Sequence, residues 1–386
     1  MSRALRQRRA TPSFDVAIIG LGVMGSAALA ALARRGRRVV GLDRFAPGHD
    51  CGSSHGATRV IRLGYFEHPS YVPLVRSAYP LWRELEARSG QSLLVITGIL
   101  EIGAPGSELV AGTLRSSRLH RLPHEILGGP SVMKRFPAFR LPQDFVGVFQ
   151  PDGGFVRAEP AVVALQTLAR RSGGELRAEE RVLAVEPHRD GVQVTTRRGN
   201  IHAGCAIVAA GPWVNSLLPQ LRAPIRVTRQ VLGWFEPADH ARGQFAAERF
   251  PVFLLQNSDG IFYGFPADAN GVKVAKHHHL DEAVDPDHYD RAVSATDEAA
   301  IRIAVRAHLP DADGPLVAAQ TCLYTMTPDG DFIIDRVPGC PQIIVAAPCS
   351  GHGFKFAPVI GEILADLAVI GRTDHDISRF ALKRFS

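Results

Sequence analysis

The fold is decided by residues 14–28, which read Phe-Asp-Val-Ala-Ile-Ile-Gly-Leu-Gly-Val-Met-Gly-Ser-Ala-Ala. Residues 16–19 are apolar and mostly β-branched, which is typical of a buried parallel strand. Residues 26–33 continue as an alanine- and leucine-rich segment with the composition of a helix. Three glycines with the spacing G-x-G-x-x-G lie between them, namely Gly20, Gly22 and Gly25. The stretch therefore predicts a strand, a tight turn and a helix.

This turn has the chemistry of a dinucleotide site. Its glycines let the backbone approach a pyrophosphate closely, and the free N–H groups at the start of the helix attract negative charge. A second apolar run, residues 38–42, ends at Asp43, 18 residues after Gly25. A carboxylate at this position can accept hydrogen bonds from both ribose hydroxyls, which favours FAD or NAD over a 2′-phosphorylated nucleotide.

Length and charge narrow the class of protein. At 386 residues the chain is too long for one ordinary core, so two domains are expected. The net charge is +6, and four arginines fall within the first nine residues. The other arginines are scattered and form no stripe with aromatic residues, so nucleic-acid binding is not predicted. The basic excess instead indicates a basic tail and a site for anionic small molecules.

Cysteine usage and hydropathy indicate the compartment. The chain has five widely spaced cysteines and no C-x-x-C motif, which predicts no disulfide framework and a reducing, cytoplasmic setting. No apolar run reaches the roughly 20 residues that a membrane-spanning helix needs, so we expect no membrane association.

Hydrophobic periodicity predicts the remaining elements. Residues 1–13 are expected to be a disordered basic tail. Helices are predicted at 71–88, 159–172, 285–309 and 359–370. Strands are predicted at 93–102, 182–185, 192–196, 201–211, 317–323 and 343–347, with four to five strand-like runs of a mostly antiparallel sheet between 225 and 280.

Three further motifs carry chemical groups. Residues 52–62 read Gly-Ser-Ser-His-Gly-Ala-Thr-Arg-Val-Ile-Arg, a loop of small residues followed by two arginines three positions apart. Such a loop is either a solvated basic turn or a cofactor loop with hydroxyl and N–H groups near phosphates. Residues 322–329 read Cys-Leu-Tyr-Thr-Met-Thr-Pro-Asp, and residues 350–355 read Ser-Gly-His-Gly-Phe-Lys.

Together with the glycine turn, these motifs resemble the monomeric sarcosine oxidase and N-methyltryptophan oxidase family, FAD-dependent oxidoreductases of the D-amino-acid-oxidase type. The resemblance implies an α/β (α+β) fold with a Rossmann-like FAD-binding domain and a second substrate domain on a mixed, largely antiparallel sheet. It implies an FAD-binding domain from residues 14–90, 150–222 and 322–386, and a substrate domain from 91–149 and 223–321.

The resemblance also implies that FAD is attached covalently through a thioether between Cys322 and the C8 methyl group of the isoalloxazine. A thiol is one of few side chains able to form such a bond. By position in the motifs, the residues expected at the cofactor are Gly20, Gly22, Gly25, Asp43, Ser53, Ser54, Thr58, Cys322, Gly351, Gly353 and Lys355.

The catalytic roles follow from the same resemblance. Lys273 matches the lysine that lies over the flavin, where a cation stabilises the superoxide that develops from oxygen. Arg62 and Lys355 match the pair that holds the substrate carboxylate. Arg59 matches the arginine on the other flavin face. His277 and Tyr324 match catalytic residues of the pocket, and Tyr263 matches a substrate-binding tyrosine.

Two local features depart from simple expectations. The triplet 277–279 is three consecutive histidines, but neighbouring side chains on a strand point to opposite faces, so no metal site is predicted. Cys349, preceded by proline, stands where the family tends to have an aromatic-type residue. Residues 276–279, Lys-His-His-His, are also more basic than the family leads us to expect. Both positions can line the pocket, so the substrate is expected to be larger or more acidic than sarcosine.

The sequence thus predicts a monomeric FAD-dependent oxidase of a secondary, N-methyl amino acid that uses dioxygen and yields an imine and hydrogen peroxide. One alternative is an oxidase of a bulkier or cyclic substrate such as N-methyltryptophan or pipecolate. Another is a flavin dehydrogenase with a different electron acceptor. An NAD-dependent dehydrogenase would give Cys322 no role, and a non-enzymatic nucleotide-binding protein would leave four motifs unexplained.

Overall fold

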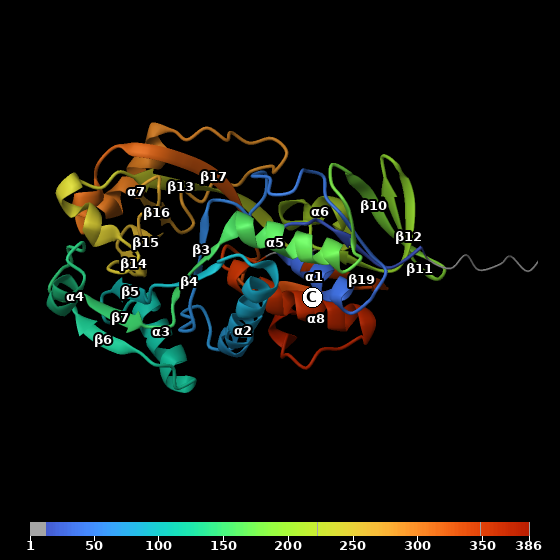
Figure 1. Ribbon diagram of the computed structural model, residues 1–386, viewed down its shortest axis with the longest axis horizontal. Coiled ribbons are helices and arrows are strands. Elements are labelled where there is room, and N and C mark those ends of the chain that lie inside the picture. Colours follow the sequence, from blue (N-terminus) through green and yellow to red (C-terminus); the bar gives the residue numbers. More distant parts are fainter. Residues whose placement is uncertain (1–12, 222, 348, 386) are drawn as a thin grey trace, which may run out of the picture.

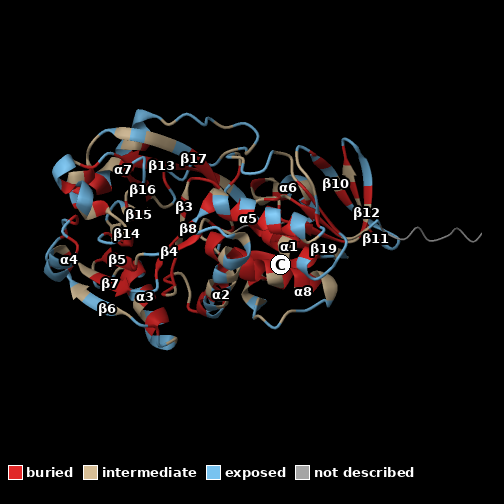
Figure 2. Ribbon diagram, in the orientation of Figure 1, coloured by how far each residue is buried: buried red, intermediate tan, exposed pale blue. Residues whose placement is uncertain are grey.

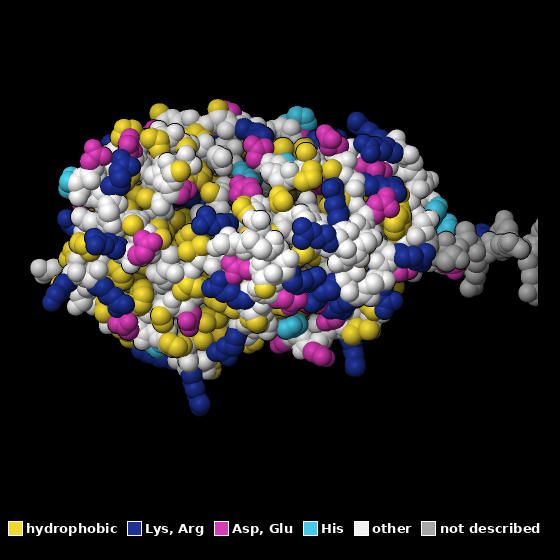
Figure 3. Space-filling view, viewed as in Figure 1, with side chains coloured by type: hydrophobic (Ala, Val, Ile, Leu, Met, Phe, Trp, Pro, Cys, Tyr) yellow, Lys and Arg dark blue, Asp and Glu magenta, His cyan; other side chains and the backbone are white. Residues whose placement is uncertain are grey.

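The computed structural model describes residues 13–221, 223–347 and 349–385, so the predicted disordered tail lies, apart from Ser13, outside the described residues. The described chain forms three sheets flanked by helices (Figure 1). None of the described helices combines the length and apolar composition needed to cross a bilayer. Basic and acidic side chains are interspersed over the face in Figure 3, so the described residues form no large field of one sign there.

The first sheet joins segments that are far apart in the sequence. Its five parallel strands follow the order β9 (Glu175–Arg177), β2 (Val39–Leu42), β1 (Phe14–Ile19), β12 (Gly199–Val208) and β19 (Cys340–Ala347). The hairpin β10 (Val182–His188) and β11 (Gly191–Thr196) extends β12, and β18 (Ile333–Val337) pairs antiparallel with β19. Ile19 pairs with both Leu42 and Val208, so the glycine turn leaves the middle of the sheet. The predicted Rossmann-like part of the fold is confirmed.

Helices cover one face of this sheet (Figure 1). They are α1 (Val23–Arg34), α5 (Ala158–Arg171) and α8 (Ala357–Val369). α2 (Tyr71–Ser89) packs against α8 and α5 instead. α1 packs against both α5 and α8, and its alanines let the neighbouring helices approach closely. It is therefore buried along most of its length, whereas α5 exposes its outer side (Figure 2).

The second sheet is mixed and largely antiparallel, as predicted. Its order is β17 (Leu316–Met326), β13 (Arg226–Phe235), β16 (Val272–Lys276), β15 (Gly260–Gly264), β14 (Val252–Asn257), β5 (Ile99–Gly103), β7 (Val146–Gln150) and β6 (Glu125–Gly128). Among the described strands of this second sheet, only β14 and β5 pair in parallel. α3 (Glu108–Leu119), α4 (Gly129–Arg135) and α7 (Ala295–His308) accompany this sheet. The short helix α6 (Val214–Leu217) follows β12.

A small third sheet lies between the two large ones. It consists of β3 (Thr58–Ile61), β8 (Gly154–Arg157) and β4 (Leu94–Ile96), all antiparallel. The predicted strand 93–102 is therefore two strands, β4 and β5, which belong to different sheets. β17 continues without a break to Met326, so the expected domain boundary at residue 322 falls inside one strand of the second sheet.

The predicted helix 285–309 is shorter than its sequence pattern indicates. α7 begins only at Ala295, because the Ser294 hydroxyl accepts a hydrogen bond from the N–H of Asp297 and the Asp297 carboxylate accepts one from Ser294 in return. Residues 285–294 instead form a segment that reaches the first sheet. There Asp287 accepts a hydrogen bond from the Trp213 indole at 2.7 Å and forms an ion pair with Arg44.

A buried ion network fixes the end of β16. The guanidinium of Arg229 donates to both carboxylate oxygens of Asp297 at 2.8 and 2.9 Å, and Nε2 of His279 lies 2.9 Å from the same carboxylate. The three histidines follow β16 rather than lying on it, since His278 turns the chain with φ +58°. Among the described residues no cluster of three potential metal ligands is present.

This network predicts a large effect on stability. Asp297→Ala removes the buried carboxylate from Arg229 and leaves it only the exposed Glu282 at 3.5 Å, so we expect the free energy of unfolding to fall by about 3 kcal/mol. Urea unfolding followed by circular dichroism measures it. Glu125→Ala, which removes an exposed partner of Arg135, serves as the control and should cost less than about 1 kcal/mol. Equal effects of the two variants would contradict a stabilising role for the network.

Candidate functional site

The main cavity lies at the carboxyl ends of the parallel strands in the first sheet, where open α/β sheets bind ligands. At that edge it is lined by Ile19 of β1, Leu42 of β2, Ala209 after β12 and Ala347 of β19. Its other end is lined by Cys322 and Tyr324 of β17 and by His277 after β16. One elongated cavity therefore connects the glycine turn to the second sheet.

The glycine turn leaves no room for a side chain at Gly20 or Gly25. Gly20 has φ +91°, and a Cβ atom there would lie 2.6 Å from the carbonyl oxygen of Ala209. A Cβ atom on Gly25 would lie 1.8 Å from the carbonyl oxygen of Gly20. Gly20 and Gly22 line the cavity, whereas Gly25 packs beneath the turn and does not. Two glycines thus face a ligand and the third permits the turn itself.

Asp43 lines the same end of the cavity and holds the turn in shape. Its carboxylate accepts hydrogen bonds from the N–H of Leu21 at 2.6 Å and from the N–H of Phe45 at 2.8 Å. The carboxylate is thereby fixed beside the turn, in the place where a ribose would lie.

The small-residue loop ties the glycine turn to the second sheet. The Ser54 hydroxyl accepts a hydrogen bond from the N–H of Val23, in the first turn of α1, at 3.0 Å. The Ser53 hydroxyl donates to the carbonyl of Leu323 in β17 at 2.6 Å. Arg59 donates to the carbonyls of Ser53 and of the preceding residue, which orients its guanidinium along the cavity wall.

Cys322 is a buried free thiol that lines the cavity. Burial raises its thiol pKa, and the positive charges of Arg59 and Lys273 oppose that rise. The thiol lies at the end of the cavity opposite the glycine turn, together with Tyr324.

The residues around the cavity fit the FAD that the sequence motifs imply. The turn and the start of α1 offer a close approach and positive potential for a pyrophosphate, and Asp43 offers acceptors for a ribose. Arg59 and Cys322 line the far end, where an isoalloxazine ring would lie. The chemistry of the cavity, from the glycine turn to Cys322, therefore matches an extended dinucleotide.

Arg62 is buried in the cavity wall beside a carboxylate that the sequence analysis missed. Its guanidinium donates to both oxygens of Glu67 at 2.7 and 2.6 Å and lies 3.6 Å from the buried Glu101. It also lies over the ring of Tyr65 at 4.3 Å. The only sign of the Arg62–Glu67 pair in the sequence is that an acidic residue follows the arginine by five positions. Glu101 lies on β5, and nothing in the sequence indicates that it reaches Arg62.

Burial strongly shifts the pKa values of the ionisable groups around Arg62. Burial, reinforced by the Arg62 charge, lowers the pKa of Lys355 to about 7. Burial raises the pKa of Glu101 to about 8. Burial also acts to raise the pKa of Glu67, but the adjacent Arg62 outweighs it and lowers that pKa to about 2. Near neutral pH the pair Arg62–Glu67 is thus ionised, whereas Lys355 and Glu101 titrate.

Three further predicted residues meet at the same end of the cavity. Nδ1 of His277 lies 3.3 Å from the hydroxyl of Tyr324, and Tyr263 lines the cavity beside them. Burial, followed by the nearby His278, lowers the pKa of His277 well below its ordinary value. Burial raises the pKa of Tyr263 to about 12. The group presents a neutral imidazole and neutral phenols to a ligand.

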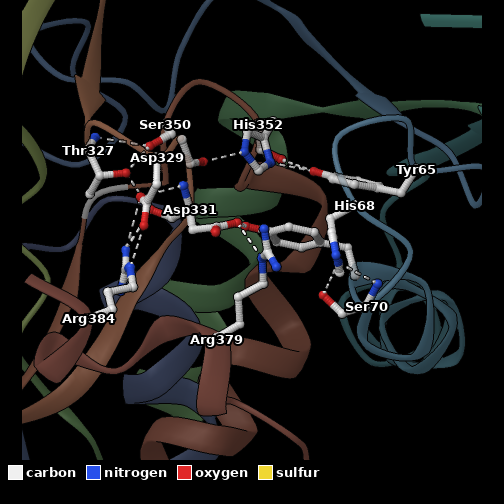
Figure 4. A network of polar contacts seen from close by, with 12 residues as sticks. Tyr65, His68, Ser70, Thr327, Asp329, Asp331, Ser350, His352, Arg379 and Arg384 are labelled. Atoms are coloured by element: carbon white, nitrogen blue, oxygen red, sulfur yellow. Dashed lines mark hydrogen bonds and ion pairs between the residues drawn. The ribbon is translucent and has the colours of Figure 1, made fainter. Parts of the chain in front are cut away.

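The turn that carries Gly351 and Gly353 is held by a polar network (Figure 4). Nε2 of His352 lies 3.0 Å from a main-chain carbonyl oxygen, that of Gly330, and Nδ1 contacts the Tyr65 hydroxyl. Burial lowers the pKa of His352 to about 4, so the ring is neutral, with Nε2 donating and Nδ1 accepting. Lys355 donates to the carbonyl of His352 at 2.7 Å, which places its ammonium near Arg62.

Asp331 anchors the same network from below (Figure 4). Its carboxylate accepts hydrogen bonds from Tyr71 at 2.7 Å and Arg379 at 2.8 Å. Its carbonyl accepts one from the hydroxyl of Thr327, whose N–H donates to Ser350 at 3.3 Å. The turn at one end of the cavity is therefore braced by the C-terminal segment.

The structure does not place Lys273 and Thr58 in the lining of this cavity. Lys273 is buried on β16, and its Nζ donates to the carbonyl of Gly56 at 2.6 Å, to the carbonyl of Thr58 at 2.9 Å and to its hydroxyl at 3.1 Å. Burial, followed by the Arg59 charge, lowers its pKa well below the usual value. The three acceptors match the three N–H bonds of the protonated form.

Apolar residues that the sequence analysis did not single out form the wall of the pocket near His277. They are Phe66, Leu254, Ile261, Phe265 and Phe354, and Cys349 lines the cavity with them. A sequence cannot distinguish such residues from ordinary core, because burial alone explains apolar side chains at these positions.

Comparison with known proteins supports the conclusion that the cavity fits FAD. The model of a family described as FAD dependent oxidoreductase matches residues 15–367. The chain is 41% identical to a monomeric sarcosine oxidase of Streptomyces avermitilis, over 97% of this chain and 99% of that protein. It is 38% identical to an N-methyl-L-tryptophan oxidase of Salmonella arizonae, over 97% and 99% of the two chains.

A solved structure agrees with the same fold. NikD, an unusual amino acid oxidase essential for nikkomycin biosynthesis, superposes with a TM-score of 0.83 at 30% identity, covering 96% of this chain and 98% of NikD. The family match extends over most of the chain and includes the glycine turn, the Arg59 loop and the Cys322 strand. The chain therefore belongs to the FAD dependent oxidoreductase family.

Proposed function

We propose that the protein is an oxidase of a secondary, N-methyl amino acid, similar to sarcosine oxidase. The observation that carries the proposal is the buried pair Arg62 and Lys355, which lines the same cavity as His277, Tyr324 and the glycine turn. The Arg62 guanidinium, joined by Lys355 when that amine is protonated, suits the carboxylate of an amino acid rather than a simple amine.

The site residues divide the work of binding and positioning. When bound, FAD supplies a two-electron acceptor for the carbon next to the amine nitrogen. The imine product hydrolyses in water, and dioxygen takes up the electrons to give hydrogen peroxide. Arg62 holds the substrate carboxylate. Because Glu67 already accepts hydrogen bonds from this guanidinium, it must share the guanidinium with the substrate or move away from it. The neutral His277 and Tyr324 favour an uncharged amine.

The alternative substrate is a bulkier or cyclic secondary amino acid, such as N-methyltryptophan or pipecolate. Cys349 supports it, because a small side chain lines the cavity where the family tends to have an aromatic-type residue. The apolar wall of Phe66, Leu254 and Ile261 would pack against such a side chain. A screen of N-methyl and cyclic amino acids by peroxide release distinguishes the two, and peroxide from none of them would leave a dehydrogenase.

We further propose covalent FAD on Cys322, a monomer, and a cytoplasmic location. The five free cysteines accord with a reducing compartment. The division into an FAD-binding domain of residues 14–90, 150–222 and 322–386 and a substrate domain of 91–149 and 223–321 belongs to the same proposal. The site residues named from the motifs, Lys273 and Thr58 included, keep the roles expected of them.

Covalent attachment can be tested by acid precipitation. We expect the washed pellet to stay yellow and the intact mass to exceed that of the chain by one FAD. Cys322→Ser should give a colourless pellet, because a hydroxyl does not replace the thiol in this bond. Cys349→Ser, a second thiol in the same cavity, is the matched control and should keep the yellow pellet. A yellow pellet from Cys322→Ser would remove Cys322 from this role.

The role of Lys273 can be tested by separating the two half-reactions. We expect Lys273→Met to slow the reaction of reduced flavin with dioxygen by roughly 100-fold or more, because the cation stabilises charge developing on oxygen. Flavin reduction by substrate should change far less. Stopped-flow absorbance measures both. Equal losses in the two half-reactions would count against the assigned role.

The electrostatics of the pocket predict that carboxylate binding weakens as pH rises. Above pH 7 Lys355, with a pKa of about 7, loses its positive charge, and above pH 8 Glu101, with a pKa of about 8, gains a negative one. Titration of the flavin spectrum with acetate measures the affinity. Lys355→Met should remove the loss near pH 7, whereas Lys276→Met, a lysine outside the cavity, should keep it. An affinity that rises with pH would contradict this account.

A further inference from the structure

Tyr65 is a buried residue that touches both cations of the substrate pocket without lining the pocket itself. Its side chain is fully buried in the region between α2, α3 and the Gly351–Gly353 turn. Among the described residues, Arg62 and Lys355 line the main cavity, whereas Tyr65 does not. Any effect of Tyr65 on a ligand must therefore pass through these two side chains.

The face of the Tyr65 ring lies against the guanidinium of Arg62. The central carbon of the guanidinium lies 4.3 Å from the centroid of this ring and 4.8 Å from that of Phe66, and Nη1 donates to the carbonyl of Gly64 at 3.0 Å. A cation over an aromatic face is attracted by the ring, more strongly where water is excluded. Phe66 and Glu67 line the cavity, so Tyr65 and Gly64 hold Arg62 from behind.

The hydroxyl of Tyr65 lies beside Lys355 (Figure 4 shows its contact with His352). Nζ of Lys355 lies 3.5 Å from the Tyr65 oxygen and donates to the carbonyl of His352 at 2.7 Å. Nδ1 of the neutral His352 ring accepts from the Tyr65 hydroxyl, because Nε2 donates to the carbonyl of Gly330. The Tyr65 proton thus points to His352, and the lone pairs of its oxygen are left for Lys355.

The surrounding fold fixes the Tyr65 ring. It stacks on Tyr71 of α2 with the centroids 4.7 Å apart, and the edge-on ring of Phe356 lies at 5.4 Å. The Ser116 hydroxyl of α3 donates to the Tyr65 carbonyl at 2.5 Å. None of these contacts involves a residue that lines the cavity. The position of the ring is therefore set before a ligand arrives.

We propose that Tyr65 is a positioning residue for carboxylate recognition, whose ring face holds Arg62 and whose hydroxyl holds Lys355. This role rests on the proposed function, in which the two cations bind the substrate carboxylate. Partners that are already in place lower the cost of ordering the site when a ligand binds. When the substrate displaces Glu67, Arg62 keeps its place because the contacts behind it remain.

Two substitutions separate the two contacts. Tyr65→Phe keeps the ring face and removes the hydroxyl, whereas Tyr65→Leu removes both. The control for a lost ring is Phe139→Leu, because Phe139 stacks on Phe250 in the core of the second sheet, away from the cavity lining. The control for a lost hydroxyl is Tyr79→Phe, which removes a hydrogen bond to the carbonyl of Asp152.

The contact with Arg62 is tested by titrating the flavin spectrum with acetate at pH 6, below the pKa of about 7 of Lys355. We expect Tyr65→Leu to weaken acetate binding by roughly tenfold, because Arg62 loses the aromatic face in a desolvated site. Tyr65→Phe keeps that face and should stay within about threefold of the wild type. In turnover, Tyr65→Leu should raise KM by a similar factor and change kcat little, since Tyr65 does not touch the reacting atoms.

The contact with Lys355 is tested by the pH dependence of the same titration. The ionisable groups that face Lys355 are Arg62, Glu67, Glu101, Cys349 and His352. Removing an acceptor from the ammonium lowers its pKa, so Tyr65→Phe should move the loss of acetate affinity near pH 7 to lower pH. Tyr79→Phe should leave it in place. Because Tyr65→Phe keeps the packing, this test does not depend on the folding of Tyr65→Leu.

The positioning role and the proposed function fail in different ways. Equal acetate affinities of Tyr65→Leu and Phe139→Leu, or a wild-type pH dependence in Tyr65→Phe, would overturn the role of the ring or of the hydroxyl. If Arg62→Leu weakens acetate binding and neither Tyr65 variant differs from its control, the carboxylate site stands and the positioning role is overturned. If Arg62→Leu binds acetate as the wild type does, both proposals are overturned.

Discussion

The absence of a side chain at Gly25 is the constraint on which the structure depends. The space that a Cβ atom would occupy lies 1.8 Å from the carbonyl oxygen of Gly20, so β1 and α1 can meet only if this residue is glycine. That contact sends α1 away from the middle of the first sheet and opens the cavity at the strand ends. Asp43, Ser54 and the loop to Arg59 are all placed relative to this turn. At the far end of the cavity, His277, Cys322 and Lys355 come 252 to 330 residues after Gly25 in the sequence. They are nevertheless aligned with the turn through β12 and β19.

At the far end, burial rather than residue type decides the chemistry. Arg62 stays charged because the carboxylate of Glu67 is hydrogen-bonded to it. Lys355 and Glu101 have pKa values of about 7 and about 8, so their charges change near neutral pH. The site is therefore a balance of four ionisable groups. An incoming carboxylate changes that balance, because it competes with Glu67 for the same guanidinium.

Much of the fold could be predicted because its signals are local. The strand, turn and helix of residues 14–34 follow from spacing, and the mixed second sheet follows from repeated strand-like runs. The partners of Arg62 could not be predicted, since Glu101 reaches it only through the packing of β5. The length of α7 was wrong because the capping interaction of Ser294 and Asp297 ended the helix earlier than hydrophobic periodicity indicated. The histidine triplet was expected on a strand, yet the backbone turn at His278 separates His277 from His279. The roles of Lys273 and Cys322 stay predictions from the motifs.

The segment 285–294 joins the second sheet to the nucleotide end of the cavity, through Asp287 with Trp213 and Arg44 and through Arg291 with Asp50. These contacts are partly exposed, and salt screens exposed ion pairs, whereas the guanidinium of Arg62 is buried. The two ends of the cavity therefore differ in their sensitivity to the medium. Raising the ionic strength therefore weakens the ion pairs of Arg44 and Arg291 at the nucleotide end of the cavity. The same change has much less effect at Arg62, where we propose that the substrate carboxylate binds.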